Sequence, residues 1–452
     1  MSEKNLNEQP LEPLFDFETA PKEVNLFHGE IILSYKNYSY TTEVDVVLKF
    51  TPTPSVIMKV VLSVPSVPGE LINLLINFSN EITYKINGIK VEGLIKSFNV
   101  FSGDLYILPS KQPVQVVGNT EVKNTVASVF HLFNFPVFSG KNAHLIHAPV
   151  GYRHLILQNN QWQAIIQSLP STKQAADQIK TEGGVFLTHV GKLERIDGKR
   201  FSGAETDEQY DLIYSFLSFA TGVKCRPVCR VGLDENGTRT WEYWSSPVSS
   251  HVTISWFNPL FCHQVELLFP LFSQRWKQSK EWEGALRSSI YWYLQANTLG
   301  EVRGIDAAII LAQSALERLA YHYLVIEQEK ITEKQFKNKN FKTSDKLRQL
   351  LSSLKIPIDI TGDMPSIKKE QACFKWEDIP HALTDIRNSL IHPVSKDKER
   401  MARCYVDAWR FSLWYIELTI LALCGYEDSY RNRLKNTWTA DVDDVPWKNK
   451  EA

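Results

Sequence analysis

The spacing of apolar residues changes once along this 452-residue chain, near residues 270–280. Before this point, short runs of β-branched and aromatic residues alternate with Pro, Gly and Asn, a pattern typical of strands and turns. After it, apolar residues recur every three or four positions, as on the buried face of a helix. The sequence therefore predicts an α+β protein, with a β-rich domain over 23–270 and an all-α domain over 279–436.

We expect the β-rich domain to be sandwich-like, with one or two inserted helices. Helical patterns cover 172–181 and 206–221, the second with Asp207 or Thr206 as its cap and Gly222 at its end. Asn87-Gly88 directly follows a strand-like run and predicts a hairpin turn. The clearest strand-like runs are Glu30–Tyr35, Val44–Phe50, Ser55–Leu62, Ile82–Ile86 and Phe186–Val190.

Two apolar series predict the buried faces of long helices in the second domain, as in a helical bundle. The first runs from Val302 to Tyr323 and the second from Val406 to Leu423. Residues 1–22 are expected to be a disordered N-terminus and 437–452 a C-terminal tail.

Composition limits the environment and the partners. The formal net charge of −1 argues against binding nucleic acid with the whole surface, so any basic surface must be local. Six cysteines and the lack of a signal-like N-terminus predict a reducing, cytoplasmic setting. The longest apolar run, Leu413–Cys424, is interrupted by Glu417 and is too short for a spanning helix, so no membrane partner is expected.

One short segment near the C-terminus combines an arginine, an amide and a histidine. Residues 385–393 read Asp-Ile-Arg-Asn-Ser-Leu-Ile-His-Pro, and the surrounding apolar residues predict a helix with one buried stripe. Asn388 and His392 share a face of this helix, and Arg387 lies about 100° away round the axis. Pro393 disfavours helical geometry before it, so His392 should lie in or just beyond the last turn, where the helix dipole favours a protonated ring.

These residue types suit phosphate chemistry. A guanidinium binds phosphate through a planar fork of donors, and an imidazole transfers protons near neutral pH. The spacing alone does not decide the matter, because a surface arginine and a helix-capping histidine produce the same pattern.

At Arg387, Asn388 and His392 the sequence resembles the HEPN family of helical nucleases, whose motif is Arg, a polar residue and then His four to six positions after the Arg. The stretch Leu311–Leu319 resembles the earlier HEPN helix that carries an acidic residue. The plan of a long β-rich region followed by one HEPN domain resembles ApeA-like antiphage proteins. The motif resemblance covers roughly 285–435, so the all-α domain is expected to be a HEPN bundle.

The resemblance implies a metal-independent endoribonuclease that leaves a 2′,3′-cyclic phosphate and a 5′-OH. In that mechanism His392 is the general acid or base, Arg387 stabilises charge on the phosphate oxygens, and Asn388 orients the phosphate or the ring. Glu317 is the candidate that holds Arg387 or His392 in place. The alternative for Glu317 is a non-catalytic ion pair with Arg387 at the edge of the core.

The resemblance also implies partners. HEPN nucleases usually pair two motifs across a two-fold interface, and this chain has one, so a homodimer or higher even oligomer is expected. The implied role is antiphage defence by abortive infection, cutting RNA (tRNA among the candidates) after the β-rich domain senses a phage-derived trigger. The alternative is a non-catalytic HEPN-like module that binds a nucleotide or a partner.

A local basic surface would support RNA binding. Residues 330–435 contain 20 Lys and Arg against 14 Asp and Glu. A lysine-rich stretch with Phe336 and Phe341 interleaved could contact the RNA backbone and stack a base, although a solvated helical hairpin fits the same pattern. The residues expected to bind RNA are Lys339, Lys342, Lys396, Lys398, Arg400 and Arg403.

No metal or other cofactor is expected. His144 and His147 are three residues apart in a strand-like segment near His154, so their side chains should point to opposite faces. Cys225 and Cys229 lack zinc-site spacing and a second pair, which favours buried or partly exposed thiols.

Overall fold

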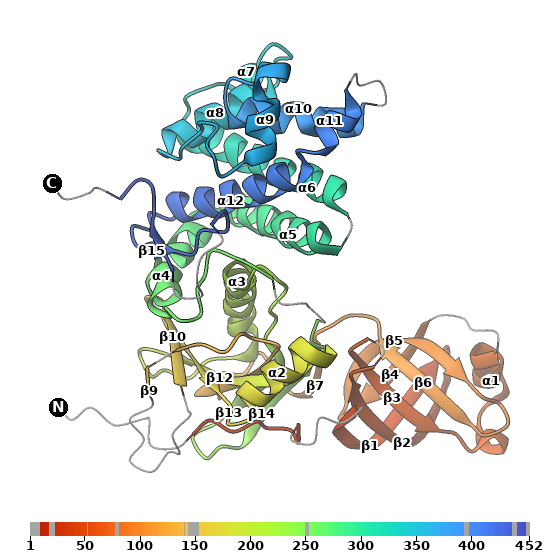
Figure 1. The fold of residues 1–452 in the computed structure, drawn as a ribbon. Helices are drawn as coiled ribbons and strands as arrows, with labels where there is room; N and C mark the ends of the chain where they lie inside the picture. The colour runs from red at the N-terminus through yellow and green to blue at the C-terminus, as the bar shows by residue number, and fades with distance from the viewer. Residues whose placement is uncertain are drawn as a thin grey trace, which may run out of the picture. The chain divides into compact units, whose positions relative to one another are not determined.

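The structure is a computed structural model. It divides into two compact units, Met1–Ile213 with Cys225–Ser250 and Tyr214–Lys224 with His251–Ala452. The first unit is β-rich and the second is mainly helical, so the predicted α+β class is confirmed (Figure 1). The residues that the structure describes are 10–17, 23–51, 53–76, 81–139, 141–142, 153–248, 253–302, 304–392, 397–435 and 441–448.

The chain first forms a closed antiparallel barrel with strand order β1-β2-β3-β6-β5-β4. Alternate residues of each strand point inward, and Val44, Val46 and Leu48 of β2 are almost fully buried. The predicted turn at Asn87-Gly88 is confirmed, since both residues have positive φ and join two paired strands. The barrel elements are β1 (Glu23–Tyr35), β2 (Tyr38–Lys49), β3 (Ser55–Val61), the 3-10 helix η1 (Val64–Ser66), α1 (Gly69–Ile76), β4 (Glu81–Ile86), β5 (Ile89–Phe98) and β6 (Asp104–Pro109).

A second, eight-stranded antiparallel sheet follows, with order β7-β14-β13-β8-β12-β11-β10-β9. The prediction of a sandwich is therefore wrong. Alternation shows which residues of a strand are buried but not which strands pair, and here the first six close on themselves. The elements are β7 (Val114–Gly118), β8 (Ala127–Phe133), β9 (Lys141–Asn142), β10 (Arg153–Gln158), β11 (Trp162–Ser168), α2 (Thr172–Glu182), β12 (Leu187–Arg195), α3 (Gly203–Thr221), β13 (Val228–Leu233) and β14 (Arg239–Trp244).

Both predicted inserted helices are present as α2 and α3, but the predicted start of α3 is wrong. Ser202 and Glu205 form a reciprocal cap, in which the amide of Ser202 donates to Glu205 Oε2 at 2.8 Å and the amide of Glu205 donates to Ser202 Oγ at 3.3 Å. The helix therefore begins at Gly203, three residues before Thr206. It ends as predicted, because Gly222 takes a φ of 73° that other residues rarely adopt.

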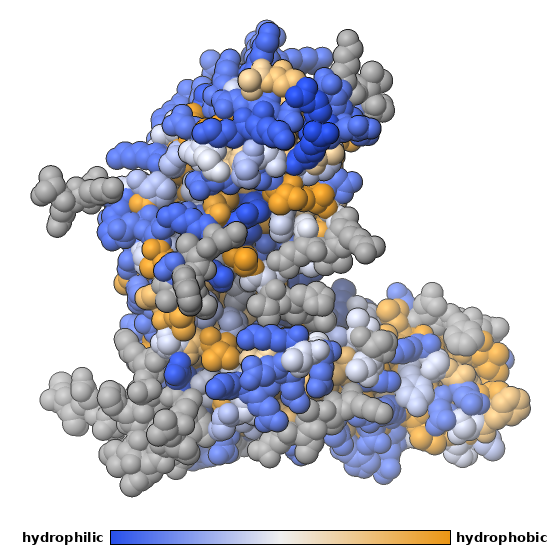
Figure 2. All heavy atoms as spheres, in the orientation of Figure 1, coloured by the Kyte–Doolittle hydropathy of each residue, from blue (hydrophilic) through white to orange (hydrophobic). Residues whose placement is uncertain are grey.

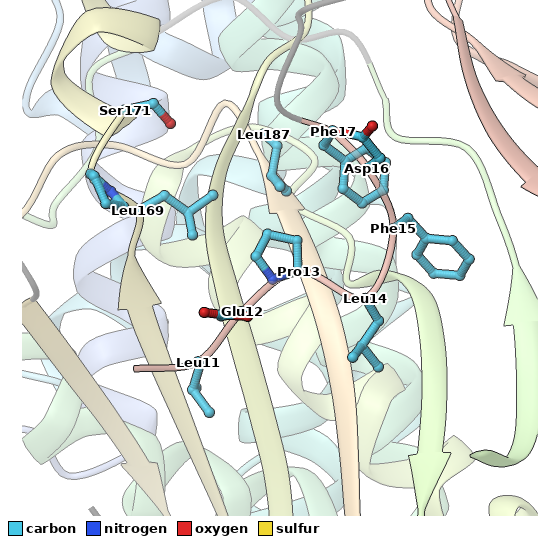
Figure 3. A pocket seen from close by; sticks show the side chains of 11 residues that line it. Leu11, Glu12, Pro13, Leu14, Phe15, Asp16, Phe17, Leu169, Ser171 and Leu187 are labelled. Atoms are coloured by element: carbon cyan, nitrogen blue, oxygen red, sulfur yellow. The ribbon is translucent and has the colours of Figure 1, made fainter. Parts of the chain in front are cut away.

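Residues 10–17 lie along the eight-stranded sheet, so the expected disorder of 1–22 is wrong for this segment. The amide of Leu11 donates to Gln167 Oε1 at 3.0 Å, and the amide of Leu14 donates to His131 Nε2 at 3.1 Å. Phe15 and Phe17 are buried in the main core of the unit. Figure 3 shows this segment beside a pocket of about 790 Å³ that it lines with residues 169–171 and Leu187.

The second unit is a helical assembly completed by a two-stranded ribbon. The predicted helix from Val302 to Tyr323 is wrong at its start, because Val302 ends α5 and α6 begins after Gly304. Beyond Tyr321 the chain stays helical as a π-helix that contains Tyr323. The elements are α4 (His263–Lys277), α5 (Lys280–Val302), α6 (Ile305–Tyr321), η2 (His322–Glu327), α7 (Glu333–Phe336), α8 (Thr343–Ser353), α9 (Pro365–Phe374), α10 (Ile379–Ile391), α11 (Lys398–Ala402), α12 (Tyr405–Leu423), β15 (Ser429–Tyr430) and β16 (Asp443–Asp444).

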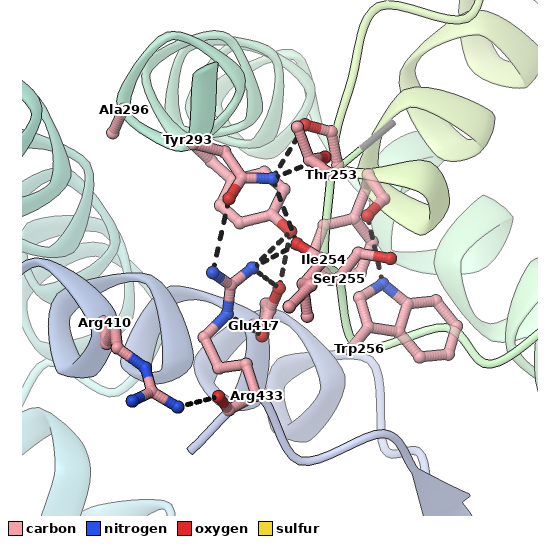
Figure 4. A network of polar contacts seen from close by, with 12 residues as sticks. Thr253, Ile254, Ser255, Trp256, Tyr293, Ala296, Arg410, Glu417 and Arg433 are labelled. Atoms are coloured by element: carbon pink, nitrogen blue, oxygen red, sulfur yellow. Dashed lines mark hydrogen bonds and ion pairs between the residues drawn. The ribbon is translucent and has the colours of Figure 1, made fainter. Parts of the chain in front are cut away.

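A buried polar network ties the C-terminal segment to α5 and α12 (Figure 4). Arg433 Nε donates to Glu417 Oε2 at 2.9 Å, and its Nη2 lies 2.5 Å from Glu417 Oε1. Burial alone would lower the pKa of Arg433, but the charge of Glu417 outweighs burial and raises that pKa. Nη2 also donates to the Ile254 carbonyl at 2.8 Å, so the network holds the chain that leads into the helices.

No helix in the described residues is both long and apolar enough to cross a membrane. Figure 2 shows hydrophilic side chains over most of the visible surface of α8, α9, α10 and α11. The candidate site lies within this part of the second unit.

Candidate functional site

Helix α10 carries the Arg-Asn-x3-His motif, and its ends are set by local chemistry. Asp378 caps the N-terminus, where its Oδ1 accepts a hydrogen bond from the amide of His381 at 2.8 Å. At the other end, the amide of His392 donates to the carbonyl of Asn388 at 2.9 Å, after which the backbone becomes extended. The prediction that His392 lies just beyond the last turn is confirmed.

Arg387 is partly buried and forms no ion pair among the described residues. Its Nη1 donates to Asn388 Oδ1 at 3.3 Å, and its Nε is buried without a hydrogen-bond partner. Two other arginines of this unit differ, since Arg400 pairs with Glu370 at 2.7 Å and Arg433 pairs with Glu417. A guanidinium that lacks a carboxylate is free to bind an external anion.

His392 is exposed, and its ring makes no hydrogen bond or ion pair with any residue that the structure describes. It does not contact Arg387 through such a bond. The two groups therefore lie within about a turn and a half of each other at the end of α10 without a bond between them.

Glu317 is partly buried on α6 and has no hydrogen bond or ion pair with Arg387 or His392 in the described chain. Helices α6 and α10 do touch, since Gln313 Nε2 donates to Thr384 Oγ1 at 3.5 Å. The predicted role of Glu317 in holding the motif remains a prediction.

An open pocket of about 520 Å³ lies between the start of α8 and one face of α10. Asn388 lines this pocket, which places the motif amide at its edge. The sequence had pointed to Asn388 and Lys342 as site residues, to Arg348 as part of the basic stretch and to Asp385 as a residue that stabilises the helix, but not to the pocket that brings them together. Every lining residue is polar, namely Lys342, Thr343, Ser344, Asp345, Arg348, Glu377, His381, Thr384, Asp385 and Asn388.

Arg348 lines the pocket and is already paired with two carboxylates. Its Nε donates to Asp378 Oδ2 at 2.5 Å and its Nη1 donates to Asp345 Oδ1 at 2.6 Å. The hydrogen bond that Arg348 donates to Asp378 is the main reason that the pKa of Arg348 is raised. Arg348 therefore holds α8 against the cap of α10 and contributes little free positive charge to the pocket.

His381 and Asp385 form a pair on the pocket face of α10. The amide of Glu377 donates to His381 Nδ1 at 3.4 Å, so the neutral tautomer that keeps this contact carries its proton on Nε2. Nε2 lies 3.5 Å from Asp385 Oδ2, which also accepts a hydrogen bond from Trp376 Nε1 at 3.1 Å. The four-residue spacing of His381 and Asp385 on a predicted helix was the signal available in the sequence.

The residues predicted to bind RNA have different surroundings. Arg400 is held by the buried Glu370, which makes it a structural residue, and the pKa of Arg400 is raised mainly by that hydrogen bond. The predicted stacking of a base on Phe336 is wrong, because its ring is buried against Tyr321. Lys396 lies outside the described residues. Lys339, Lys342, Lys398 and Arg403 are exposed.

The described residues contain no group of three or more His, Cys, Asp or Glu side chains that could hold a metal ion. His144 and His147 lie outside the described residues, and His154 Nε2 contacts Gln167 Oε1 at 3.1 Å. Cys225 and Cys229 are buried free thiols, as the spacing suggested.

Comparisons with known proteins match two separate parts of the chain. Residues 279–444, which include all of α10 and its pocket, match the model of the YopA C-terminal domain, and residues 122–254 match that of the YopA central domain. The chain is 30% identical over 302 residues to the SPbeta prophage-derived uncharacterized protein YopA of Bacillus subtilis (strain 168). The match covers 65% of this chain and 66% of that protein, slightly under two thirds of the relative's length. No solved structure gives a significant match. In its central and C-terminal parts, the chain is thus similar to YopA.

Proposed function

We propose that this protein is an endoribonuclease of the HEPN type whose active residues lie at the C-terminal end of α10. The observation that carries this proposal is the state of Arg387: a partly buried guanidinium with no carboxylate partner in the described chain and an unsatisfied Nε. Leaving a buried donor without a partner is costly unless a ligand uses it. Nε itself is closed to solvent, so a bound phosphate would contact the Nη atoms, or would draw the side chain outward until Nε also has an acceptor.

The chemistry follows from the types and positions of these groups. The ribose 2′-OH attacks the adjacent phosphorus and the bond to the 5′ oxygen breaks, which leaves a 2′,3′-cyclic phosphate and a 5′-OH. Arg387 binds the phosphate oxygens as their charge rises, with Asn388 fixing the direction of the guanidinium. His392, exposed at the helix end, transfers a proton at the attacking or the leaving oxygen.

A second motif would come from a second copy of the chain, so the active form is a homodimer or a higher even oligomer. Ile391, adjacent to His392, is 41% exposed, so apolar surface borders the motif. The relative's name places it in a prophage, which fits a role in conflict between a resident phage and an infecting one. We therefore assign RNA cleavage after infection, triggered through the β-rich unit, with tRNA among the candidate substrates.

Sequencing of RNA ends after induced expression tests this function. The wild-type protein is expected to arrest growth and to produce new 5′-OH ends at defined positions. His392→Ala should lower cleavage by about 100-fold or more, as for loss of a general acid or base, and Arg387→Ala by about 100- to 1,000-fold. Light scattering on the purified protein should show an even number of subunits.

The controls are matched in residue type. Arg318→Ala removes an exposed arginine of α6, and His263→Ala removes a histidine at the start of α4; neither should change cleavage. Full activity in both Arg387→Ala and His392→Ala, with unchanged folding, would rule out the nuclease. RNA binding that depends on Arg387 but produces no cut ends would favour the binding module instead.

A further inference from the structure

The polar pocket between α8 and α10 has no role in the cleavage chemistry just described, yet it shares Asn388 with it. Its volume of about 520 Å³ lies within the range of about 300–1,000 Å³ that is usual for small-ligand sites. All of its lining side chains are polar, which excludes an apolar ligand.

The charges of the pocket exclude a phosphate group as its occupant. Arg348, the most central cation, is neutralised by Asp378 and Asp345. Glu377 Oε2 also lies 3.7 Å from Arg348 Nη2, Asp385 adds a further carboxylate, and Lys342 is the remaining Lys or Arg among the lining residues. The pocket therefore has more carboxylate groups than unpaired Lys or Arg side chains. A ligand that fits it should be uncharged and should carry several hydrogen-bond donors.

Asp385 offers such a group an oriented acceptor. Its Oδ2 is fixed by His381 Nε2 and by Trp376 Nε1, whereas its Oδ1 accepts no hydrogen bond from any described residue. The side chain is 39% exposed, so Oδ1 can be reached from the pocket. A carboxylate held in this way is pre-organised to receive donors from a ligand.

Asn388 links the pocket to the phosphate-binding arginine. Its Oδ1 accepts a hydrogen bond from Arg387, while its side chain also lines the pocket one turn after Asp385. Asn388 therefore lies between the guanidinium that would bind a phosphate and the pocket that would receive a base.

We propose that this pocket is a base-recognition subsite that selects an RNA base with an exocyclic amino group, guanine most strongly. The proposal rests on the proposed nuclease function for the identity of the polymer. Guanine carries two adjacent donor groups, N1–H and the 2-amino group, so one can donate to Asp385 Oδ1 while the other faces the remaining acceptors of the pocket. Uracil has a single donor on this edge, N3–H, and the carbonyl oxygens on either side of it would face the carboxylate and repel it.

Binding of uncleavable RNA tests the subsite without relying on catalysis. The probes are 2′-O-methyl pentanucleotides UUGUU and UUUUU, which lack the 2′-OH nucleophile and differ in one base. Wild-type protein should bind UUGUU about 10-fold more tightly, the scale of one good base contact. Asp385→Asn, which exchanges one acceptor oxygen for a donor, should reduce this ratio to about twofold or less.

Two further variants test whether the preference for UUGUU comes from the pocket and not from phosphate binding or from another surface carboxylate. Arg387→Ala should weaken both pentanucleotides by the same factor, because the phosphate is common to them. Asp363→Asn changes an exposed carboxylate in the turn before α9, outside the pocket, and should keep the wild-type ratio.

A wild-type ratio near one, a ratio that survives Asp385→Asn, or no binding of either probe would overturn the proposal. Failure of the nuclease is recognised separately, from unmodified RNA. If the protein discriminates between the probes but does not cleave RNA, the base-recognition proposal stands and the nuclease proposal fails. If it cleaves RNA but does not discriminate, the nuclease proposal stands and the base-recognition proposal fails.

Discussion

Glu417 and Arg433 form an ion pair from which water is almost entirely excluded, with side-chain exposures of 0% and 4%. The pair joins α12 to the segment after it, and Tyr293 of α5 donates its hydroxyl hydrogen to Glu417 Oε1 at 2.5 Å. Neither residue lines the pocket beside α10 or pairs with Arg387, so we assign the pair to folding and not to the proposed chemistry.

Removing one member of this pair should be strongly destabilising. Arg433→Met leaves a buried carboxylate without its cation, and the expected loss is about 3–5 kcal/mol of unfolding free energy. Urea denaturation of the full chain, followed by far-UV circular dichroism, measures it. The double variant Glu417→Leu with Arg433→Met should lose less than the sum of the single variants, because no charge is then left unpaired.

An exposed ion pair provides the contrast. Lys435 pairs with Asp443 at 2.8 Å, and the lysine side chain is 47% exposed. Lys435→Met should change the unfolding free energy by less than about 1 kcal/mol. Equal effects of Lys435→Met and Arg433→Met would contradict the assignment of Arg433 as a structural anchor.

Alanine substitutions at two glycines of α5 should change the unfolding free energy in opposite directions. A Cβ at Gly300 would lie 2.0 Å from Trp409 Cε2, and the indole cannot easily move because its Nε1 donates to the Ala296 carbonyl at 2.9 Å. Gly300→Ala should therefore cost about 1–3 kcal/mol through overpacking. Gly284 has open space at the same position, so Gly284→Ala should gain up to about 1 kcal/mol from helix propensity. Thermal melts of the two variants test this, and a stable Gly300→Ala would mean that α5 and α12 are packed less closely.

Acid should destabilise the β-rich unit through two buried histidines. Burial lowers the pKa of His131 to about 4 and that of His189 to about 3, against about 6.5 in the unfolded chain. As pH falls below 6.5 the unfolded chain binds protons that the folded chain does not, so stability decreases with falling pH until the folded values are reached. Between pH 7.5 and pH 5 each histidine should cost about 2 kcal/mol.

Variants separate the contributions of His189 and His131 to the loss of stability in acid. His189 stacks on Phe138 with ring centroids 5.0 Å apart and has no hydrogen-bond partner among the described residues, so His189→Phe should remove its share of the pH dependence without a large loss of stability at pH 7.5.

Protonation of His131 also removes the acceptor used by the amide of Leu14. Because the pKa of His131 in the folded chain is about 4, this acceptor is lost only near or below that pH. Protection of the Leu14 amide against hydrogen exchange should therefore fall between pH 7.5 and about pH 3.5 more than protection within α3 does, and equal protection at both values would argue against this link.

Arg387 and Arg400 should differ in stability as well as in activity. Arg387→Met removes a guanidinium with no carboxylate partner in the described chain and should leave the unfolding free energy within about 0.5 kcal/mol of wild type, or raise it, because functional polar groups often reduce stability. Arg400→Met leaves the buried Glu370 unpaired and should lower the denaturation midpoint. If Arg387→Met proved the more destabilising, Arg387 would be a structural residue.

Local patterns were sufficient for part of the architecture. The change of apolar period separated the β-rich from the helical part, and strands β1 to β4, helices α2 and α3 and the turn at Asn87-Gly88 followed from short-range signals. The motif helix and its end at His392 were also predictable, because an amphipathic stripe followed by proline depends on neighbouring residues alone. The start of α3 was missed because the Ser202-x-x-Glu205 capping box was not recognised.

The sequence by itself determined several of the helices and strands and which arginine and histidine share the end of one helix, since these depend on residues a few positions apart. Closure of the barrel, the seating of residues 10–17 and the pocket beside Asn388 were decided only by tertiary structure. Tertiary contacts also separated Arg400, held by Glu370, from Arg387, which has no such partner in the described chain. Those features depend on contacts between residues tens to hundreds of positions apart, and no local pattern specifies which distant carboxylate will neutralise a given guanidinium.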